Sequence, residues 1–218
     1  MDSDVSDPPA TAGTDTRATN GNDSRATTGL VMCGGEGSRL RPAVGDTEKP
    51  LVEVGDEPMI DRVVAALQAS SLTTVAAAVS PATPETAAHL VGLEGIECIE
   101  TAGEGYVADL REALARLDTP TVTVAADLPL VTANHVDRAV AIAAGDSLTV
   151  CVPASLAADL GVSAETTIDH DGESVVPTGL NVVGDGVERT VVWQDNRLAY
   201  NVNRPGDLRA VEAWLDHQ

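Results

Sequence analysis

Several residue types are scarce in this chain of 218 residues, and each scarcity limits what the protein can be. There is no Phe, and 13 basic residues stand against 34 acidic ones, which gives a formal net charge of -21. Because a surface this negative repels a phosphate backbone, nucleic acid is excluded as a partner. The chain also lacks an apolar run near the ~18 residues of a membrane span and a secretory signal at its start, so we expect a cytoplasmic protein.

Lysine and cysteine are rare as well, and both scarcities concern the surroundings of the protein. Lys49 is the only lysine, and Asp, Ala, Val and Thr are abundant. This composition is typical of a halophilic protein in a salt-rich cytoplasm, where the Debye length is only about 3 Å at 1 M salt. Cys33, Cys98 and Cys151 are widely spaced in apolar stretches and form no C-x-x-C pair. We therefore expect buried free thiols in place of disulfides or a zinc site.

The start of the chain differs in composition from the remainder. Residues 1–27 are rich in Asp, Thr, Ser, Asn, Gly and Ala, with Val5 the one sizeable apolar side chain after Met1. Such a segment buries too little apolar surface to offset the entropy of ordering it, so we expect a disordered acidic tail. Residues 28–218 suit one domain around one sizeable core.

From Leu30 onward, apolar runs typical of strands alternate with patterns typical of helices. The expected strands of this part are Leu30–Cys33, Leu51–Val54, Val75–Val79, Ile96–Ile99 and Thr121–Ala125. After about Leu148 the strand-like pieces Leu148–Val152, Ser174–Val176, Leu180–Val183 and Thr190–Trp193 follow closely, and Asp171-Gly172 favours a hairpin. We therefore predict an α/β fold: a mostly parallel sheet flanked by helices, a mixed-sheet C-terminal part, and a ligand at the carboxyl ends of the strands.

A glycine-rich turn follows the first predicted strand, with the sequence Gly34-Gly35-Glu36-Gly37-Ser38-Arg39. Its glycines allow the backbone to approach an anion and aim N–H groups at it, and Arg39 adds a bidentate fork. The spacing matches neither the P-loop nor the dinucleotide fingerprint. Lys49 follows in Glu48-Lys49-Pro50-Leu51; the alternative is a solvated surface lysine, although every other basic position uses arginine. Because a compact ammonium can follow a moving phosphate, the combination predicts a phosphate site.

A single aspartate follows the buried strand Thr121–Ala125. Asp127 has the position and chemistry to hold Mg²⁺ with its waters and nucleotide phosphates. The alternative is a turn or N-cap aspartate before the helix expected near Asn134. The four histidines, His89, His135, His170 and His217, fall outside every motif, so we predict no histidine metal cluster.

These residues also carry a family resemblance. Gly34–Leu40 followed by Glu48–Leu51 resembles the signature loop of nucleotidyltransferases with the GT-A-like fold, which include sugar-phosphate nucleotidylyltransferases and molybdenum-cofactor guanylyltransferases. Later segments are similar, in the same order, to the archaeal GTP:adenosylcobinamide-phosphate guanylyltransferase family: Val79–Pro84, Gly103–Leu110, Ala125–Leu128, Val176–Val183 and Tyr200–Asn203. The resemblance extends from Gly29 to the C-terminus and implies a Rossmann-like GT-A nucleotidyltransferase fold.

The resemblance implies transfer of GMP from GTP to adenosylcobinamide phosphate, with release of pyrophosphate, in cobalamin (vitamin B12) biosynthesis with Mg²⁺ as cofactor. It implies catalytic roles for Arg39 and Lys49 and a metal-binding role for Asp127. The nucleotide-binding residues that it implies are Gly34, Gly35, Glu36, Gly37, Ser38, Arg39, Lys49, Ser80, Pro81, Gly105, Tyr106 and Asp127. The acceptor-binding residues that it implies are Pro177, Thr178, Gly179, Asn181, Asn201 and Asn203.

Alternatives stay open for some of these residues. Thr178-Gly179 also suits a strand-opening turn, and Asn201 and Asn203 also suit side chains that satisfy backbone groups. Asp127 is followed by Leu128 and Pro129, so the D-x-D arrangement of some relatives is absent.

The implied chemistry agrees with the lack of a motif histidine. A phosphate monoester has a second pKa of about 6, so it attacks as a dianion at neutral pH without a general base. Two alternatives remain: a molybdopterin or sugar 1-phosphate acceptor, and a non-catalytic nucleotide-binding module. The joint presence of Arg39, Lys49 and Asp127 favours an enzyme, and the choice of guanine rests on the resemblance. The oligomeric state is left open, because Val191–Trp193 and Trp214 suit either a core or an interface.

Overall fold

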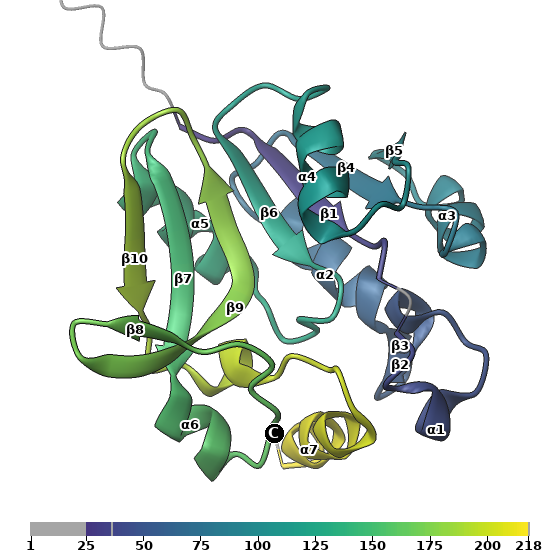
Figure 1. The fold of residues 1–218 in the computed structure, drawn as a ribbon. Coiled ribbons are helices and arrows are strands. Elements are labelled where there is room, and N and C mark those ends of the chain that lie inside the picture. Colours follow the sequence, from purple (N-terminus) through teal and green to yellow (C-terminus); the bar gives the residue numbers. More distant parts are fainter. Residues whose placement is uncertain (1–24, 36, 218) are drawn as a thin grey trace, which may run out of the picture.

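One mixed sheet of eight strands forms the centre of the computed structural model, which describes residues 25–35 and 37–217. The strand order is β10-β7-β9-β6-β1-β4-β5, and β8 pairs with β9 (Figure 1). The strands are β1 (Thr28–Met32), β4 (Thr74–Val79), β5 (Ile96–Glu100), β6 (Thr121–Ala125), β7 (Ser147–Pro153), β8 (Ile168–His170), β9 (Glu173–Val183) and β10 (Glu188–Val192). Parallel pairing joins β5, β4, β1 and β6, whereas β9 runs antiparallel to β6 and β7. The predicted α/β fold with a mixed C-terminal part is confirmed.

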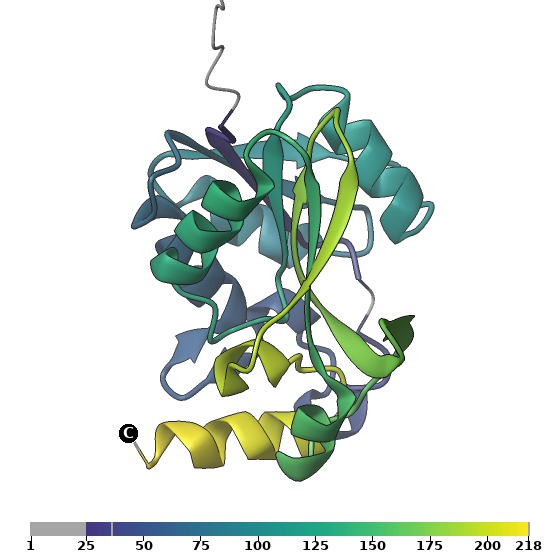
Figure 2. The same cartoon turned by 90° about the vertical axis from the view of Figure 1, so that its left-hand side faces the viewer.

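Helices cover the parallel half of the sheet on both faces. The helices are α1 (Arg41–Val44), α2 (Met59–Gln68), α3 (Pro84–Val91), α4 (Tyr106–Leu114), α5 (Ala133–Ala143), α6 (Ala154–Asp159) and α7 (Pro205–Leu215). Seen edge-on in Figure 2, α4 and α5 lie on opposite sides of the sheet. Because side chains alternate along a strand, Leu30 of β1 packs on the α4 side while Val31 packs in the larger core on the other side. A strand buried on both faces is the reason for its continuous apolar run.

Two stretches differ from the sequence prediction. The expected strand Leu51–Val54 is a 3₁₀ turn, η1 (Lys49–Leu51), followed by β2 (Glu53–Val54), which pairs with β3 (Glu57–Pro58). The expected strands Ser174–Val176 and Leu180–Val183 are one strand, β9, because Gly179 adopts a φ of 84° and a register shift opposite β7 absorbs the irregularity. The predicted Asp171-Gly172 hairpin is confirmed, since it joins β8 to β9.

The position of β1 decides where a ligand site can form. β1 lies between β4 and β6: the chain runs from β1 to β4 and β5 on one side and then crosses back to form β6 on the other side of β1. Met32 and Ala125, which end these two strands, are register partners. The turn that follows β1 and the aspartate that follows β6 are therefore neighbours at a topological switch point.

Three expectations from composition concern the N-terminal tail, the cysteine thiols and membrane spans. The predicted tail, residues 1–27, lies outside the described residues except for residues 25–27, where Ala26 is 5% exposed. Cys33, Cys98 and Cys151 are free, and burial raises the pKa of Cys151 to about 11. Within the described residues, the helices are all too short or too polar to span a bilayer.

A buried histidine links α5 to the C-terminal part. His135 is 4% exposed, its Nδ1 accepts the N–H of Thr132 at 3.1 Å, and its Nε2 lies 3.0 Å from Asp195. Burial lowers the pKa of His135, although the hydrogen bond with Asp195 opposes that effect. A protonated ring would present a second N–H to Thr132, so the folded state favours the neutral ring.

This arrangement predicts acid sensitivity near neutral pH. Because the pKa of His135 is lower in the folded state than in the unfolded chain, its contribution is fully present above about pH 6.5 and decreases as pH falls. One proton limits the slope to about 1.4 kcal/mol per pH unit. We expect chemical denaturation between pH 7.5 and 5 to show a steeper loss for the wild type than for His135→Gln. Equal slopes in the two proteins would contradict this assignment.

Candidate active site

A cavity of about 380 Å³ opens where β1 and β6 end. Six of the residues singled out in the sequence line it: Gly34, Gly35, Lys49, Gly105, Tyr106 and Asp127. Cys33 and Ala126, which follow β1 and β6, line it too, so the cavity lies at the predicted end of the sheet. The fold thus brings together residues that lie far apart in the sequence.

The glycine turn and Lys49 are in close contact. Gly37 has a φ of 60°, and a Cβ added there would lie 2.6 Å from the Cβ of Lys49. A larger residue at position 37 is therefore excluded both by its backbone conformation and by the lysine. Ser38 and Arg39 are exposed in the turn before α1, and Glu36 lies outside the described residues.

A carboxylate for which the sequence predicts no role, Glu48, anchors the segment of Lys49. Glu48 accepts the backbone N–H groups of Glu85 at 2.8 Å and Thr86 at 2.7 Å, and the Thr86 hydroxyl at 2.6 Å. These two residues lie in the first turn of α3, whose N-cap residue Thr83 makes no side-chain cap. The negative charge suits the positive end of the helix dipole, and it fixes the residue next to Lys49.

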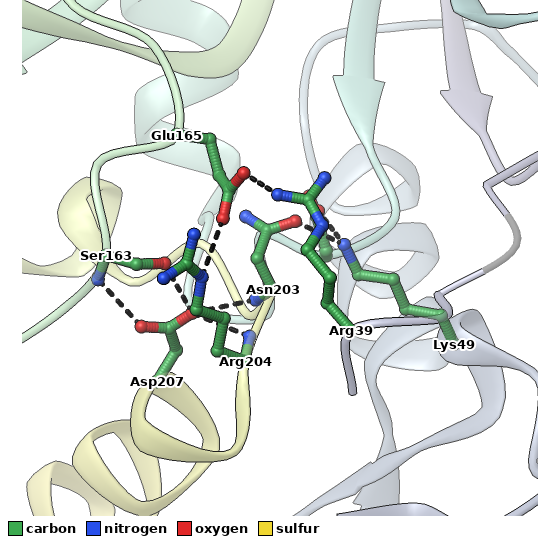
Figure 3. A network of polar contacts seen from close by, with 8 residues as sticks. Arg39, Lys49, Ser163, Glu165, Asn203, Arg204 and Asp207 are labelled. Atoms are coloured by element: carbon green, nitrogen blue, oxygen red, sulfur yellow. Dashed lines mark hydrogen bonds and ion pairs between the residues drawn. The ribbon is translucent and has the colours of Figure 1, made fainter. Parts of the chain in front are cut away.

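Lys49 joins the two halves of the site. Its Nζ forms an ion pair with Asp127 and donates a hydrogen bond to the side-chain oxygen of Asn203 at 2.7 Å. The Lys49 and Asp127 side chains are 14% and 16% exposed, so water only partly screens their attraction. The backbone N–H of Val202 donates to the carbonyl oxygen of Asp127 at 2.9 Å, which holds Asn203 beside the lysine. Figure 3 shows the ammonium and the Asn203 amide pointing toward one another.

The second oxygen of Asp127 meets the chemical requirement for a cation ligand. Oδ1 is buried and accepts no hydrogen bond from the described residues, although buried polar atoms are normally satisfied. The described residues contain no group of three His, Cys, Asp or Glu side chains suited to hold a metal ion without a substrate. Mg²⁺ commonly needs only one or two carboxylates, because waters and substrate phosphates complete its shell. Asp127 therefore fits a magnesium ion that binds together with a nucleotide.

The opposite wall of the cavity is built on the start of α4. Asp109 is 3% exposed and accepts the N–H groups of Gly103 at 2.9 Å and Glu104 at 3.3 Å. These bonds shape the turn that carries Gly105 and Tyr106. Tyr106 is 49% exposed, yet partial loss of contact with water and then the negative charge of Asp127 raise the pKa of its hydroxyl. Asp109 lies in the segment Gly103–Leu110, but no pattern in the sequence predicts this role for it.

Side chains from the C-terminal part of the chain form a second polar group next to Lys49 (Figure 3). Glu165 forms an ion pair with Arg39 and accepts a hydrogen bond from Nε of Arg204 at 3.1 Å. Asp207, which is 2% exposed, accepts the backbone N–H groups of Asn203 at 3.0 Å and Arg204 at 2.8 Å. Its oxygens also accept the N–H and the hydroxyl of Ser163, at 2.7 Å and 2.8 Å. Asp207 thus joins two segments: that of Ser163, which precedes Glu165, and that of Asn203 and Arg204.

The remaining nucleotide-binding candidates lie at the edge of the cavity. The hydroxyl of Ser80 is 3.4 Å from the carbonyl oxygen of Gly34, so it supports the turn from behind. Pro81 is exposed, and its Cδ would lie 3.2 Å from a Cβ added at Gly103. Neither residue lines the cavity itself.

The acceptor-binding candidates are divided between β9 and the segment before α7. Thr178 is 1% exposed and donates to the carbonyl oxygen of Val150, and Asn201 donates to the carbonyl oxygen of Thr178 at 2.8 Å. Pro177, Gly179 and Asn181 lie in β9, where Asn181 is the register partner of Thr123 and Thr149. Asn203 is the acceptor candidate whose side chain reaches Lys49.

Comparison with known proteins agrees with this geometry. Residues 29–165 match the model of the MobA-like NTP transferase domain. The chain is 30% identical over 200 residues to adenosylcobinamide-phosphate guanylyltransferase of Methanocaldococcus jannaschii, with 85% of this chain and 96% of that protein covered. A mannose-1-phosphate guanyltransferase of Kluyveromyces lactis is 46% identical, but over 51 residues that make up 23% of this chain and 14% of that protein.

Two solved structures share the fold. A putative glucose-1-phosphate thymidylyltransferase from Bacillus anthracis aligns with a TM-score of 0.64 at 15% identity, over 87% of this chain and 95% of that chain. A CMP:2-keto-3-deoxy-manno-octonic acid synthetase complexed with CTP aligns with a TM-score of 0.60 at 17% identity, over 89% of this chain and 99% of that chain. At these identities the likeness concerns the fold alone.

The anchoring role of Glu48 can be tested by stability. Glu48→Gln removes a charged acceptor from the start of α3, so we expect the free energy of unfolding to fall by roughly 1–3 kcal/mol. Glu53→Gln is the matched control, because Glu53 is exposed in β2. Chemical denaturation of both variants and the wild type measures the difference. Equal stability of the two variants would show that Glu48 does not hold α3 in solution.

Proposed function

The chain belongs to the MobA-like NTP transferase domain family, and we propose that it transfers GMP from GTP to adenosylcobinamide phosphate and releases pyrophosphate. It is a nucleotidyltransferase. The observation that carries the proposal is the convergence of the glycine turn, Lys49 and Asp127 at one cavity at the carboxyl end of the sheet. Identity to the archaeal guanylyltransferase over 85% of the chain supports the choice of GTP and of the corrinoid acceptor.

On the nucleotide side, the backbone amides of residues 34–39 and the Arg39 guanidinium hold the triphosphate. Lys49 donates to the α-phosphate, where negative charge increases as pyrophosphate departs. The turn that carries Gly105 and Tyr106 lies near the guanine or the ribose, with Ser80 and Pro81 behind it. The lysine has three rotatable donors, so it can exchange Asp127 for phosphate oxygens.

Asp127 is the residue that would hold Mg²⁺. Its buried second oxygen, which accepts no hydrogen bond from the described residues, supports this role. When bound, the ion supplies positive charge that neutralises phosphate oxygens and orients them. Lys49 then needs a new anionic partner, and the nucleotide provides one.

On the acceptor side, the phosphate of the corrinoid is the nucleophile. One of its oxygens forms a bond to the α-phosphorus of GTP, and the bond from that phosphorus to the oxygen leading to the β-phosphate breaks. A largely dianionic monoester needs no general base, so positioning and charge stabilisation are the main tasks of the protein. Asn203 contacts Lys49, whereas Pro177, Thr178, Gly179 and Asn181 lie in β9, and Asn201 of the segment before α7 is bonded to Thr178.

Two further properties belong to this proposal. A net charge of -21 supports work in a salt-rich cytoplasm, where dense counter-ions screen the repulsion between acidic groups and between the surface and anionic substrates. A sugar 1-phosphate acceptor is less well supported, because the mannose-1-phosphate guanyltransferases match over 51 residues only.

The reaction can be tested directly by pyrophosphate release. We expect release from GTP and Mg²⁺ with adenosylcobinamide phosphate, and much less with mannose 1-phosphate, with molybdopterin or with ATP in place of GTP. Release with another acceptor would identify that acceptor as the substrate in place of the corrinoid. Tight GTP binding without release with any of them would support a non-catalytic module instead.

Lys49 is the residue whose loss this mechanism tolerates least. We expect Lys49→Ala to lower kcat by roughly 10²-fold or more, as for the loss of other transition-state donors. Arg41→Ala is the control, since Arg41 is exposed in α1 at the end of the same turn. Thermal unfolding of both variants checks that the fold is intact. Unchanged turnover of a folded Lys49→Ala enzyme would remove the lysine from the mechanism.

A further inference from the structure

We infer that Arg204 binds the phosphate of the acceptor, and that Glu165 occupies this position until the acceptor displaces it. The inference rests on the proposed function, which it extends by a residue outside the segment matched by the family model, residues 29–165. It concerns the phosphate group only and adds no bond-making step.

The first observation is that two arginines share one carboxylate. Glu165 forms ion pairs with Arg39, from the glycine turn, and with Arg204, which precedes α7. Among the described residues, the other arginine ion pairs join one guanidinium to one carboxylate: Arg62 with Glu57, Arg116 with Glu112, Arg189 with Asp146 and Arg197 with Asp195. Two guanidinium groups around one small anion are the arrangement by which proteins bind a phosphate with bidentate hydrogen bonds.

The second observation is that this ion-pair group can exchange partners. The Arg39 and Arg204 side chains are 59% and 57% exposed, so both guanidinium groups remain accessible to a ligand. Exposed ion pairs of this kind contribute little to stability, so a dianion can compete with Glu165 for them. By contrast the backbone of Arg204 is fixed, because its N–H donates to the buried carboxylate of Asp207. The backbone of Arg204 is therefore fixed, while its exposed guanidinium is free to change partner.

The third observation is the position of Arg204 next to the reacting groups. Its neighbour Asn203 donates its backbone N–H to Asp207 and accepts a hydrogen bond from Lys49, the residue assigned to the α-phosphate. Figure 3 shows the Arg39 side chain extending between Glu165 and the Lys49 ammonium. An acceptor phosphate held by Arg204 would thus lie beside the phosphates held by Arg39 and Lys49. In-line transfer requires this proximity of two anions that otherwise repel one another.

Charge balance favours exchange over addition. A phosphate monoester carries about -1.5 to -2 charges at pH 7, and a carboxylate left beside it would repel it. With Glu165 displaced, the Arg204 guanidinium faces the dianion, while Arg39 holds the neighbouring triphosphate. In a chain with 34 acidic and 13 basic residues, a carboxylate that keeps these cations apart from other anions also limits unwanted binding.

Steady-state kinetics with GTP, Mg²⁺ and adenosylcobinamide phosphate test the inference. We expect Arg204→Gln to raise the KM for the acceptor by roughly 10- to 100-fold and to leave the KM for GTP within about twofold, as for a lost hydrogen bond to a charged group. Glu165→Gln should lower the KM for the acceptor, because the competing carboxylate is gone. Arg209→Gln, which removes an exposed arginine one turn further along α7, should resemble the wild type.

Each other outcome has a definite meaning. An unchanged acceptor KM in Arg204→Gln, or an equal rise in the KM values of both substrates, overturns the inference while leaving the proposed function intact. An unchanged or higher acceptor KM in Glu165→Gln shows that the carboxylate orients the arginines, and overturns the displacement. A wild type without activity on the corrinoid overturns the proposed function and this inference together. Glu165 keeps Arg39 as a partner in Arg204→Gln, and thermal unfolding of the variant checks that its fold is intact.

Discussion

The ion pair between Lys49 and Asp127 is the contact on which the rest of the site depends. It joins the segment that follows β1 to the residue that follows β6, across 78 positions of sequence. The parallel register of these strands makes the contact possible, because Met32 and Ala125 end side by side. Glu48 fixes the backbone next to Lys49, and the Val202 N–H fixes the backbone of Asp127, so the two side chains are held within reach of each other. The proposed site for phosphates and a cation rests on this geometry.

Most of the fold and the centre of the site could be predicted from local sequence patterns. Periodicity located the parallel strands, since apolar runs such as Thr121–Ala125 are long enough to need burial on both faces. The general rule that ligands bind at the carboxyl ends of such strands then places Gly34, Lys49 and Asp127 near one another. The same reasoning failed around Thr178-Gly179, because a strand can pass through a glycine of positive φ when its neighbour shifts register.

The roles of the carboxylates that organise the site could not be predicted from sequence patterns. Glu48, Asp109, Glu165 and Asp207 act on partners that the fold, and not the local sequence, brings to them. In a chain with 34 acidic residues, no pattern distinguishes a buried acceptor from a solvated surface charge. The open alternative for Asn201 is consistent with its bond to the Thr178 carbonyl, which satisfies a backbone group. Asn203, two residues later, instead meets Lys49, and nothing in the sequence separates the two.

The distribution of charge explains how a strongly acidic chain can hold anionic ligands. Its few cations near the cavity are each held by a carboxylate, Lys49 by Asp127 and Arg39 by Glu165. Such pairs keep ammonium and guanidinium groups oriented without leaving an isolated charge at the wall of a cavity, which would be unfavourable. In the proposed function a phosphate replaces one anion by another, so the net change in desolvation is smaller than for filling an uncharged site. In the proposed reaction Asp127, released by Lys49, would be free to bind a divalent cation, which would link the binding of metal and nucleotide through this ion pair.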